Sequence, residues 1–230
     1  MLRGSFILLP GLGLTREKKL FSSGILTWND FLKQEKIKGI SAKKKEDYNK
    51  LLQEASQALV QENSHFFKKI PSREAWRLYD DFKDKAVFLD IEIGENNKDL
   101  ILIGLFDGYE TKMFVKGVNL EKEVFFNELS KYKLIITFNG GSFDIPIIER
   151  YFNTAIDLPH FDLKHACLRL GLKGGLKKIE THLNLKRPTH LYGNPSDLWR
   201  TFFAARTMAG AVRLYFSSSS SGWPDSAKVS

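Results

Sequence analysis

The sequence feature that most constrains the fold is a change in hydrophobic spacing near Lys85. Before this residue, apolar side chains recur every three or four residues, as they do on one face of a helix. After it, short runs rich in β-branched and aromatic residues are bounded by turns, and helical spacing returns between the later runs. The predicted strands are Ala86–Ile93, Leu100–Phe106, Lys112–Val115 and Leu134–Thr137. Strands followed by strand–helix alternation predict an α/β layer with at least one parallel pair of strands.

The chain divides by composition into three regions. Residues 1–83 are predicted to be helical, with an amphipathic stripe between Tyr48 and Leu59. Residues 84–208 should form the α/β domain. Its predicted helices cover Glu121–Lys131, Ser142 to about Phe152, Leu176–Leu183 and Pro195–Ala205. Residues 209–230 include five consecutive serines and no apolar periodicity, which predicts a disordered or atypical tail.

The composition excludes several classes of protein. No apolar run approaches the roughly 20 residues of a membrane-spanning helix, and the N-terminus lacks a secretory cleavage pattern. The one cysteine, Cys167, excludes an internal disulfide and a cysteine-based zinc site, and we expect it to be a buried, inert thiol. We therefore expect a cytoplasmic protein.

Positive charge is concentrated in the first part of the chain. Residues 1–85 carry 17 Lys and Arg against 11 Asp and Glu, whereas residues 86–230 carry 18 against 16. Lys and Arg gain free energy by displacing counterions from phosphates, so this excess favours a polyanion such as nucleic acid as partner. A solvated, lysine-rich surface is the alternative.

Two carboxylates lie close together on the first predicted strand. Asp90 and Glu92 are two residues apart, so their side chains project from the same face. Their neighbours are apolar, which indicates a buried strand, and buried adjacent carboxylates repel each other unless cations compensate them. We interpret the pair as part of a divalent-cation site. The alternative is a strand with one solvated face.

A third acid follows another predicted strand. This strand ends at Asn139-Gly140-Gly141, and Asp144 lies in the first turn of the helix that we expect Ser142 to cap. Open α/β sheets place their sites beyond the carboxyl ends of parallel strands, so Asp144 should join the acids of the first strand. It could instead only stabilise the helix N-terminus.

These motifs resemble those of a known nuclease superfamily. An Asp-x-Glu strand followed about fifty residues later by Asn-x-x-x-Phe-Asp resembles the first two motifs of the DEDD 3′–5′ exonucleases. The family-B DNA polymerase proofreading domains and the YprB-like predicted exonucleases are the most similar branches. The YprB-like order is followed by Thr137-Phe-Asn-Gly-Gly-Ser-Phe-Asp144, His160-Phe-Asp-Leu163 and Gly174-Gly-Leu-Lys-Lys-Ile-Glu180. The resemblance covers roughly residues 84–205.

The resemblance implies a ribonuclease-H-like mixed sheet flanked by helices, with a small helical N-terminal extension. It implies hydrolysis of phosphodiester bonds from the 3′ end of single-stranded nucleic acid. Asp90, Glu92 and Asp144 would be the catalytic, metal-binding acids for two Mg²⁺ or Mn²⁺ ions roughly 3.5–4 Å apart. Carboxylate oxygens suit these hard cations.

Three further residues are assigned to the substrate side of this site. Asn139 would orient the terminal nucleotide or brace its turn. Phe143 could stack on a base, although ordinary core packing is the alternative. Asp162 would contact the substrate, or would hold the metal-binding acids in position without binding the metal itself.

The chain departs from the DEDD pattern at its late helix. DEDD enzymes carry a fourth acid there, preceded by a Tyr four residues earlier or a His five residues earlier. Here Tyr215 has Ser219 at the required distance, and Tyr192 precedes Asp197 with Pro195 between them. We therefore expect binding of single-stranded nucleic acid with feeble hydrolysis. A non-catalytic nucleic-acid-binding module is the alternative, and the Asn-x-x-x-Phe-Asp motif disfavours a ribonuclease-H-like endonuclease.

The N-terminal region contains a second possible contact with nucleic acid. Leu9-Pro-Gly-Leu-Gly13 resembles part of a helix-hairpin-helix element, whose glycine turn can present N–H groups to a phosphate. Such a turn can equally serve only as a packing element. Nearby lysines could contact phosphates or remain solvated: Lys18, Lys19, Lys43, Lys44 and Lys45.

Overall fold

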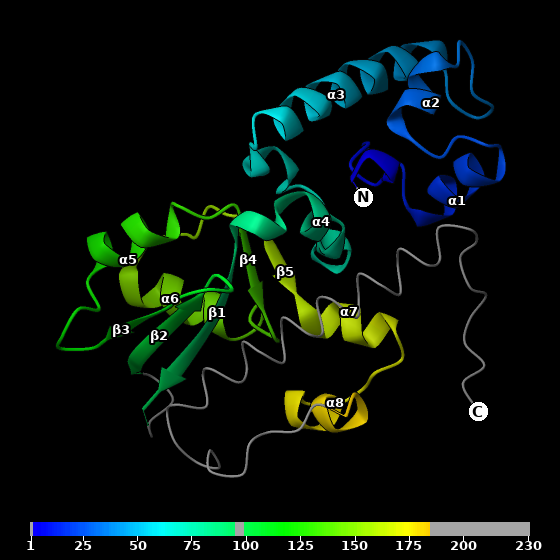
Figure 1. The fold of residues 1–230 in the computed structure, drawn as a ribbon. Coiled ribbons are helices and arrows are strands. Elements are labelled where there is room, and N and C mark those ends of the chain that lie inside the picture. Colours follow the sequence, from blue (N-terminus) through cyan, green and yellow to red (C-terminus); the bar gives the residue numbers. More distant parts are fainter. Residues whose placement is uncertain (1, 95–98, 185–230) are drawn as a thin grey trace.

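A five-stranded mixed sheet with helices on both faces forms the centre of the computed structural model, which describes residues 2–94 and 99–184 (Figure 1). The strand order is β3-β2-β1-β4-β5. The strands are β1 (Ala86–Ile93), β2 (Leu100–Phe106), β3 (Thr111–Val115), β4 (Leu134–Thr137) and β5 (His160–Asp162). β1, β2 and β3 pair antiparallel, whereas β4 is parallel to β1 and to β5. The predicted α/β class with a mixed sheet flanked by helices is confirmed.

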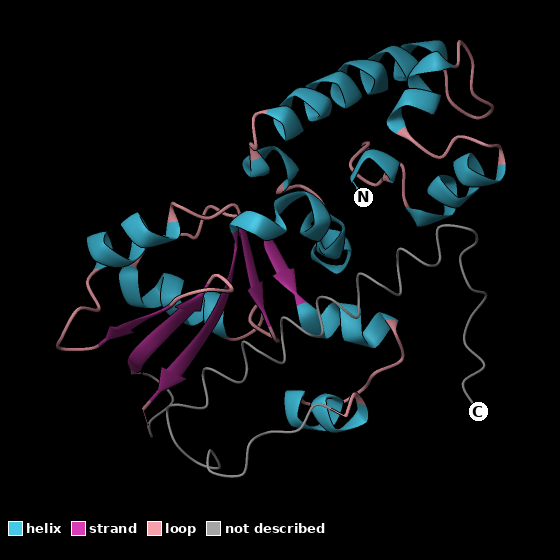
Figure 2. Cartoon of the chain, viewed as in Figure 1, coloured by secondary structure: helices cyan, strands magenta, loops and turns pink. Residues whose placement is uncertain are grey.

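Helices precede the sheet and connect its strands (Figure 2), and the longest of those described is α3 with 19 residues. Before the sheet lie η1 (Leu2–Gly4), α1 (Leu14–Ser22), α2 (Trp28–Lys33), α3 (Ala42–Val60), η2 (Ser64–Phe67), η3 (Ser72–Leu78), α4 (Tyr79–Phe82) and η4 (Lys83–Lys85), where η denotes a 3₁₀ helix. The remaining helices are α5 (Lys122–Leu129), α6 (Asp144–Phe152), α7 (Leu163–Arg169) and α8 (Leu176–His182). In the described part of the chain, no helix is long and apolar enough to cross a membrane.

The helix boundaries follow from local chemistry, with two departures from the predictions. The Thr27 hydroxyl accepts from the Asp30 N–H, and the Asp30 carboxylate accepts from the Thr27 N–H, which fixes the start of α2. After Pro71 the chain forms a 3₁₀ segment before a short α-helix, rather than one continuous helix. Helix α6 starts after Phe143 instead of Ser142, and no side chain caps it. The predicted helix Pro195–Ala205 and the predicted tail lie outside the described residues.

Alternate residues of β1 enter two separate hydrophobic cores. Val87, Leu89 and Ile91 face α5 and α6, where the Phe125 and Phe152 rings stack with their centroids 5.4 Å apart. A strand with apolar residues on both faces must be covered on both sides, because its side chains alternate between them. Helices α5 and α6 therefore cover one face of the sheet, whereas Leu163 and Ala166 of α7 belong to the core on the other face.

The N-terminal helices cover the other face. Ala86 and Phe88 of β1 share one hydrophobic core with residues of η1, α2 and α3. The stripe predicted on α3 is confirmed in part, since Tyr48, Leu52 and Ala55 are buried in this core. The helical region therefore supplies apolar cover that the sheet lacks on this face.

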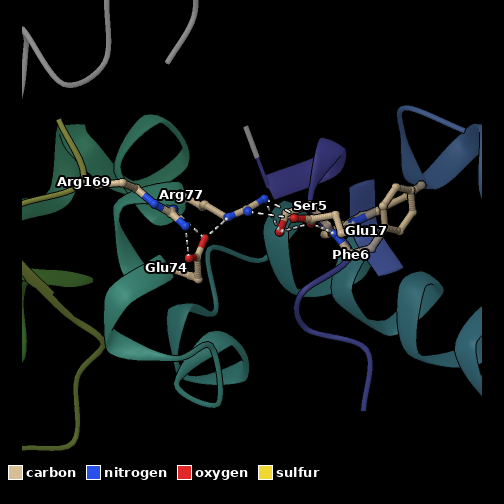
Figure 3. Close-up of polar contacts among 7 residues, drawn as sticks. Ser5, Phe6, Glu17, Glu74, Arg77 and Arg169 are labelled. Carbon is tan, nitrogen blue, oxygen red and sulfur yellow. Dashed lines mark hydrogen bonds and ion pairs between the residues drawn. The ribbon is translucent and has the colours of Figure 1, made fainter. Parts of the chain in front are cut away.

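A buried ion network joins the N-terminal helices to α7 (Figure 3). The Arg77 guanidinium donates to the Glu17 carboxylate of α1, at 2.8 and 3.1 Å, and to Glu74 at 2.9 Å. Arg169 of α7 donates to both oxygens of Glu74, at 2.6 and 2.9 Å. The Phe6 N–H also donates to Glu17, at 2.7 Å. Each charged side chain of this network, which runs from Glu17 through Arg77 and Glu74 to Arg169, therefore contacts an opposite charge, as buried ions require.

We predict that Arg77→Met destabilises the protein far more than Arg73→Met. Removing Arg77 leaves the Glu17 carboxylate buried without its cation, and loss of one partner of a buried pair typically costs about 3–5 kcal/mol. Arg73 lies on the same 3₁₀ segment but is exposed, so its removal should cost less than ~0.5 kcal/mol. Urea unfolding monitored by circular dichroism measures both losses. Equal unfolding midpoints for the two variants would contradict this account of the network.

Candidate functional site

The carboxyl groups of Asp90 and Asp144 meet where β1 and β4 separate. The parallel pairing of these strands ends at Phe88 and Ile136, so the following backbone of β1 is not paired with β4. Asp144, the first residue of α6, reaches this edge, and its carboxyl group accepts from the Ile91 N–H. The Asp90 side chain forms a hydrogen bond with Asp144. The predicted convergence of these two acids is therefore present in the structure.

Burial raises the pKa values of both carboxyl groups. Desolvation and the neighbouring charges of Asp144 and Glu92 raise the pKa of Asp90 to about 8. Desolvation likewise raises the pKa of Asp144 to about 6, although backbone N–H groups and the bond from Asp90 counteract it. Two carboxylates at hydrogen-bond distance cannot both be ionised cheaply without a cation. Without one, protonated Asp90 donates to the Asp144 carboxylate.

Glu92 lies near this pair but is more open to solvent. It is exposed, two residues beyond Asp90 on the same face, and the pairing of β1 with β2 becomes irregular between Glu92 and Ile93. Across residues 2–94 and 99–184, no group of three or more His, Cys, Asp or Glu side chains is arranged to hold a metal ion. The structure therefore shows a close pair of acids with a third nearby, rather than a closed triad.

The acid pair has the chemistry that a hard divalent cation requires. Its donors are carboxylate oxygens, the ligand type preferred by Mg²⁺ and Mn²⁺. Within the described ranges, none of the ion pairs involves Asp90, Glu92 or Asp144. The raised pKa values indicate that ionising both acids is unfavourable at this position, chiefly because burial desolvates them. A divalent cation held by Asp90 and Asp144, with Glu92 adjacent, would remove that repulsion.

Asp162 stabilises the loop between β4 and α6 through buried hydrogen bonds. It is buried, with an exposed fraction of 3%, and its carboxylate accepts from the N–H groups of Asn139, Gly141 and Lys164, at 2.8, 3.2 and 2.9 Å. These bonds tie the end of β4 to the start of α7. Because both oxygens of Asp162 face the backbone, the geometry gives it a positioning role. Direct contact with substrate stays a prediction.

The turn after β4 depends on one glycine. The Gly140 N–H donates to the Thr137 hydroxyl at 3.0 Å, and a Cβ at position 140 would lie 2.3 Å from that oxygen. Any side chain there would displace the turn. His160 of β5 hydrogen-bonds the same hydroxyl at 2.8 Å, and burial lowers its pKa. His160 therefore packs against this turn and stabilises it.

Asn139 and Phe143 lie on the open side of this turn. Asn139 has a positive φ of 67°, which Asn tolerates better than most residues. Its side-chain oxygen accepts from Lys164 Nζ at 2.8 Å. The Phe143 side chain is 42% exposed, so the alternative of core packing does not hold for it. Stacking of Phe143 on a base stays a prediction that its exposure permits.

Lys164 is the residue of this site that sequence reasoning missed. It follows the His160-Phe-Asp-Leu163 motif directly, and only the approach of α7 to the Asn139 turn gives it significance. Cys167, on the same helix, is buried, and burial raises its pKa to about 11. The prediction of a buried thiol is confirmed, and its raised pKa disfavours the reactive thiolate.

Comparison with known proteins identifies the family of this domain. Residues 87–210, more than half of the chain, match the model of the RNase H superfamily. The chain belongs to this superfamily. No curated protein matches it. RNase H-like domains generally bind nucleic acids and use divalent metals, so the match suggests a nuclease-like activity.

We predict that Asp90→Asn stabilises the metal-free protein at pH 8 but not near pH 4. The folded-state pKa of Asp90 lies above the ordinary value of 3.8, so its favourable contribution is complete at low pH and is lost as the pH rises toward 8. A neutral Asn avoids that loss, which should amount to several kcal/mol at pH 8, since a pKa difference of one unit corresponds to about 1.4 kcal/mol. Thermal unfolding in EDTA measures the difference.

The exposed Asp84 supplies the matched control, since Asp84→Asn should show no such pH dependence. Added Mn²⁺ should stabilise the wild type more than Asp90→Asn, because the cation binds the folded site. An Asp90→Asn difference that is constant from pH 4 to pH 8 would contradict the shared-proton description of the acid pair.

Proposed function

We propose that this chain is a divalent-metal-dependent 3′–5′ exonuclease of the DEDD type that acts on single-stranded nucleic acid. The observation that carries the proposal is the Asp90–Asp144 pair, which lies where β1 and β4 separate in an RNase H superfamily domain. The exonuclease branch is favoured by the Asn-x-x-x-Phe-Asp motif that ends at Asp144.

The residues of the site divide into those that hold the cation and those that hold the strand. Asp90 and Asp144 would bind Mg²⁺ or Mn²⁺, with Glu92 as the next oxygen donor. When bound, the cation supplies charge neutralisation and electrophilic assistance to phosphodiester hydrolysis. Asn139 would orient the terminal nucleotide, and the exposed ring of Phe143 would stack on a base.

The expected rate is low. The sequence lacks the Tyr-x-x-x-Asp or His-x-x-x-x-Asp pair of DEDD enzymes, and the relevant residues after Leu183 lie mostly outside the described part of the chain. A missing member of a catalytic unit typically lowers the rate by several orders of magnitude, while binding is affected less. The chain should therefore bind single strands more effectively than it cleaves them.

A non-catalytic nucleic-acid-binding module is the second candidate function. It is favoured by one observation, the lack of a cluster of three metal-binding side chains among the described residues. Such a module would keep the acid pair without turnover. The two functions differ in whether a bound strand is shortened when a divalent metal is present.

We predict that Mn²⁺ causes a single strand labelled at its 3′-terminal nucleotide to lose its label, and that Asp144→Asn slows this loss at least ~100-fold. The label should leave as a mononucleotide, because cleavage starts at the 3′ end. Gel electrophoresis of the products measures both the rate and the direction.

The Asp144→Asn protein, purified in parallel, controls for contaminating nuclease, and EDTA should abolish the reaction. Label release at equal rates by the wild type and by Asp144→Asn would count against the assignment. Tight binding of the strand without any metal-dependent shortening would identify the protein as the non-catalytic module.

A further inference from the structure

A hollow of about 440 Å³ opens beside the turn that follows β4. It lies between the end of β4, helix α7 and the turn that precedes α8. Described residues that line it are Phe138, Asn139, Lys164, Leu168, Gly174 and Gly175. Asn139 belongs to the same turn that leads into Asp144 at the start of α6. A ligand in the hollow would therefore contact the turn that leads into Asp144.

Lys164 brings a positive charge to this hollow, and no carboxylate among the described residues forms an ion pair with it. Its ammonium group donates to the neutral side-chain oxygen of Asn139 at 2.8 Å, and it takes part in none of the ion pairs found between described residues. The oxygens of Asp162, at the start of α7, are directed toward backbone N–H groups instead. A half-buried ammonium with only a neutral acceptor can still gain a charge-assisted bond to an anion.

The segment between Asp162 and Glu180, which lines much of the hollow, carries only positive charge. Residues 163–179 contain five Lys and Arg and no Asp or Glu. Arg169 is engaged by Glu74, whereas Lys173, Lys177 and Lys178 are exposed. Several positive charges close together create a positive potential that attracts anions. This segment therefore favours a polyanion over a metal cation or a ligand with a single negative charge.

The walls of the hollow leave room for a bulky group. Gly174 has a φ of +121°, which L side chains rarely adopt, and a Cβ there would lie 2.8 Å from Lys178. A Cβ at Gly175 would meet nothing within 4 Å, so the space beside it is open. Leu168 is 48% exposed at the same hollow and offers an apolar surface beside the Lys164 charge. A nucleotide unit has this combination of anionic phosphate and less polar sugar and base.

We infer that the hollow binds a nucleotide unit of the substrate strand, with its phosphate on Lys164. This inference rests on the proposed function. Lys164 is then a substrate-binding residue, and Leu168 contacts the sugar or base. The phosphate is that of an internal phosphodiester of the strand.

A purely structural role for Lys164 makes a different prediction. In that case its bond to Asn139 only holds the turn at its positive φ, and the charge itself is unimportant. Lys164→Gln separates the two roles, because a Gln amide can still donate to the Asn139 oxygen but carries no charge. Lys164→Arg keeps the charge.

The test measures binding of fluorescently labelled single strands by anisotropy in EDTA, where the metal-dependent reaction is absent. The strands, in DNA and in RNA, are about ten nucleotides long, within the usual range of binding-site sizes. In a DNA series, each phosphate in turn is replaced by a neutral methylphosphonate. The variants are Lys164→Gln and Lys164→Arg, and Lys122→Gln on the exposed surface of α5 is the control.

Lys164→Gln should weaken binding about 5- to 20-fold, while Lys164→Arg and Lys122→Gln stay within about twofold of the wild type. The slope of log affinity against log salt should fall by about 0.7 for Lys164→Gln, the value expected for one lost phosphate contact on a single strand. Methylphosphonate substitution at one position of the strand should weaken binding by the wild type but should not weaken binding by Lys164→Gln. Wild-type affinity in Lys164→Gln, or unchanged sensitivity to every methylphosphonate, overturns the inference.

A second pair of variants tests the hollow without changing Lys164. Asp and Asn both cap helices well, so Gly175→Asp and Gly175→Asn should fold equally stably at the start of α8. The added negative charge of Asp should weaken strand binding severalfold more than the neutral Asn does. Equal binding by the two variants counts against a phosphate at this place.

A folded wild type that binds no strand at all contradicts the proposed function itself. This outcome differs from strand binding that does not depend on Lys164, which contradicts only the inference about the hollow.

Discussion

The rest of the structure depends on the need to cover both faces of β1. Because side chains alternate along a strand, Val87 and Leu89 require one apolar layer and Ala86 and Phe88 require another. Helices α5 and α6 supply the first layer, and the N-terminal helices together with α7 supply the second. Where this second layer ends, at Asp90, the same face of the strand changes from apolar to acidic. The boundary of the core therefore also defines the position of the site.

The separation of β4 from β1 lets two acidic side chains meet at that boundary. Once the parallel pairing has ended, the Ile91 N–H bonds to Asp144 of the following helix instead of to a strand. This brings a second carboxyl group against Asp90, and burial raises both pKa values. The resulting electrostatic repulsion is what a divalent cation would relieve. The acids are therefore held by backbone geometry rather than by neighbouring cationic side chains.

Helix α7 connects the site to the N-terminal region. Its first residues follow Asp162, which holds the turn of Asn139, and it carries Lys164 at the hollow. Its last residue, Arg169, joins the buried network of Glu74 and Arg77. The N-terminal helices thus anchor the helix that presents Lys164, in addition to covering the sheet. This gives the basic N-terminal region a structural role besides any contact with nucleic acid.

The sequence by itself determined four of the five strands and most of the described helices, because period-2 and period-3.6 patterns are local. It also predicted that Asp90 and Asp144 lie at one edge of the sheet, because the order of the motifs places acids at strand ends. It did not determine the 3₁₀ segment after Pro71, the exposure of Phe143 or the role of Lys164. Those features depend on which segments distant in sequence come together. Only the tertiary structure decided them, because burial and side-chain partners are properties of packing across the whole chain rather than of local spacing.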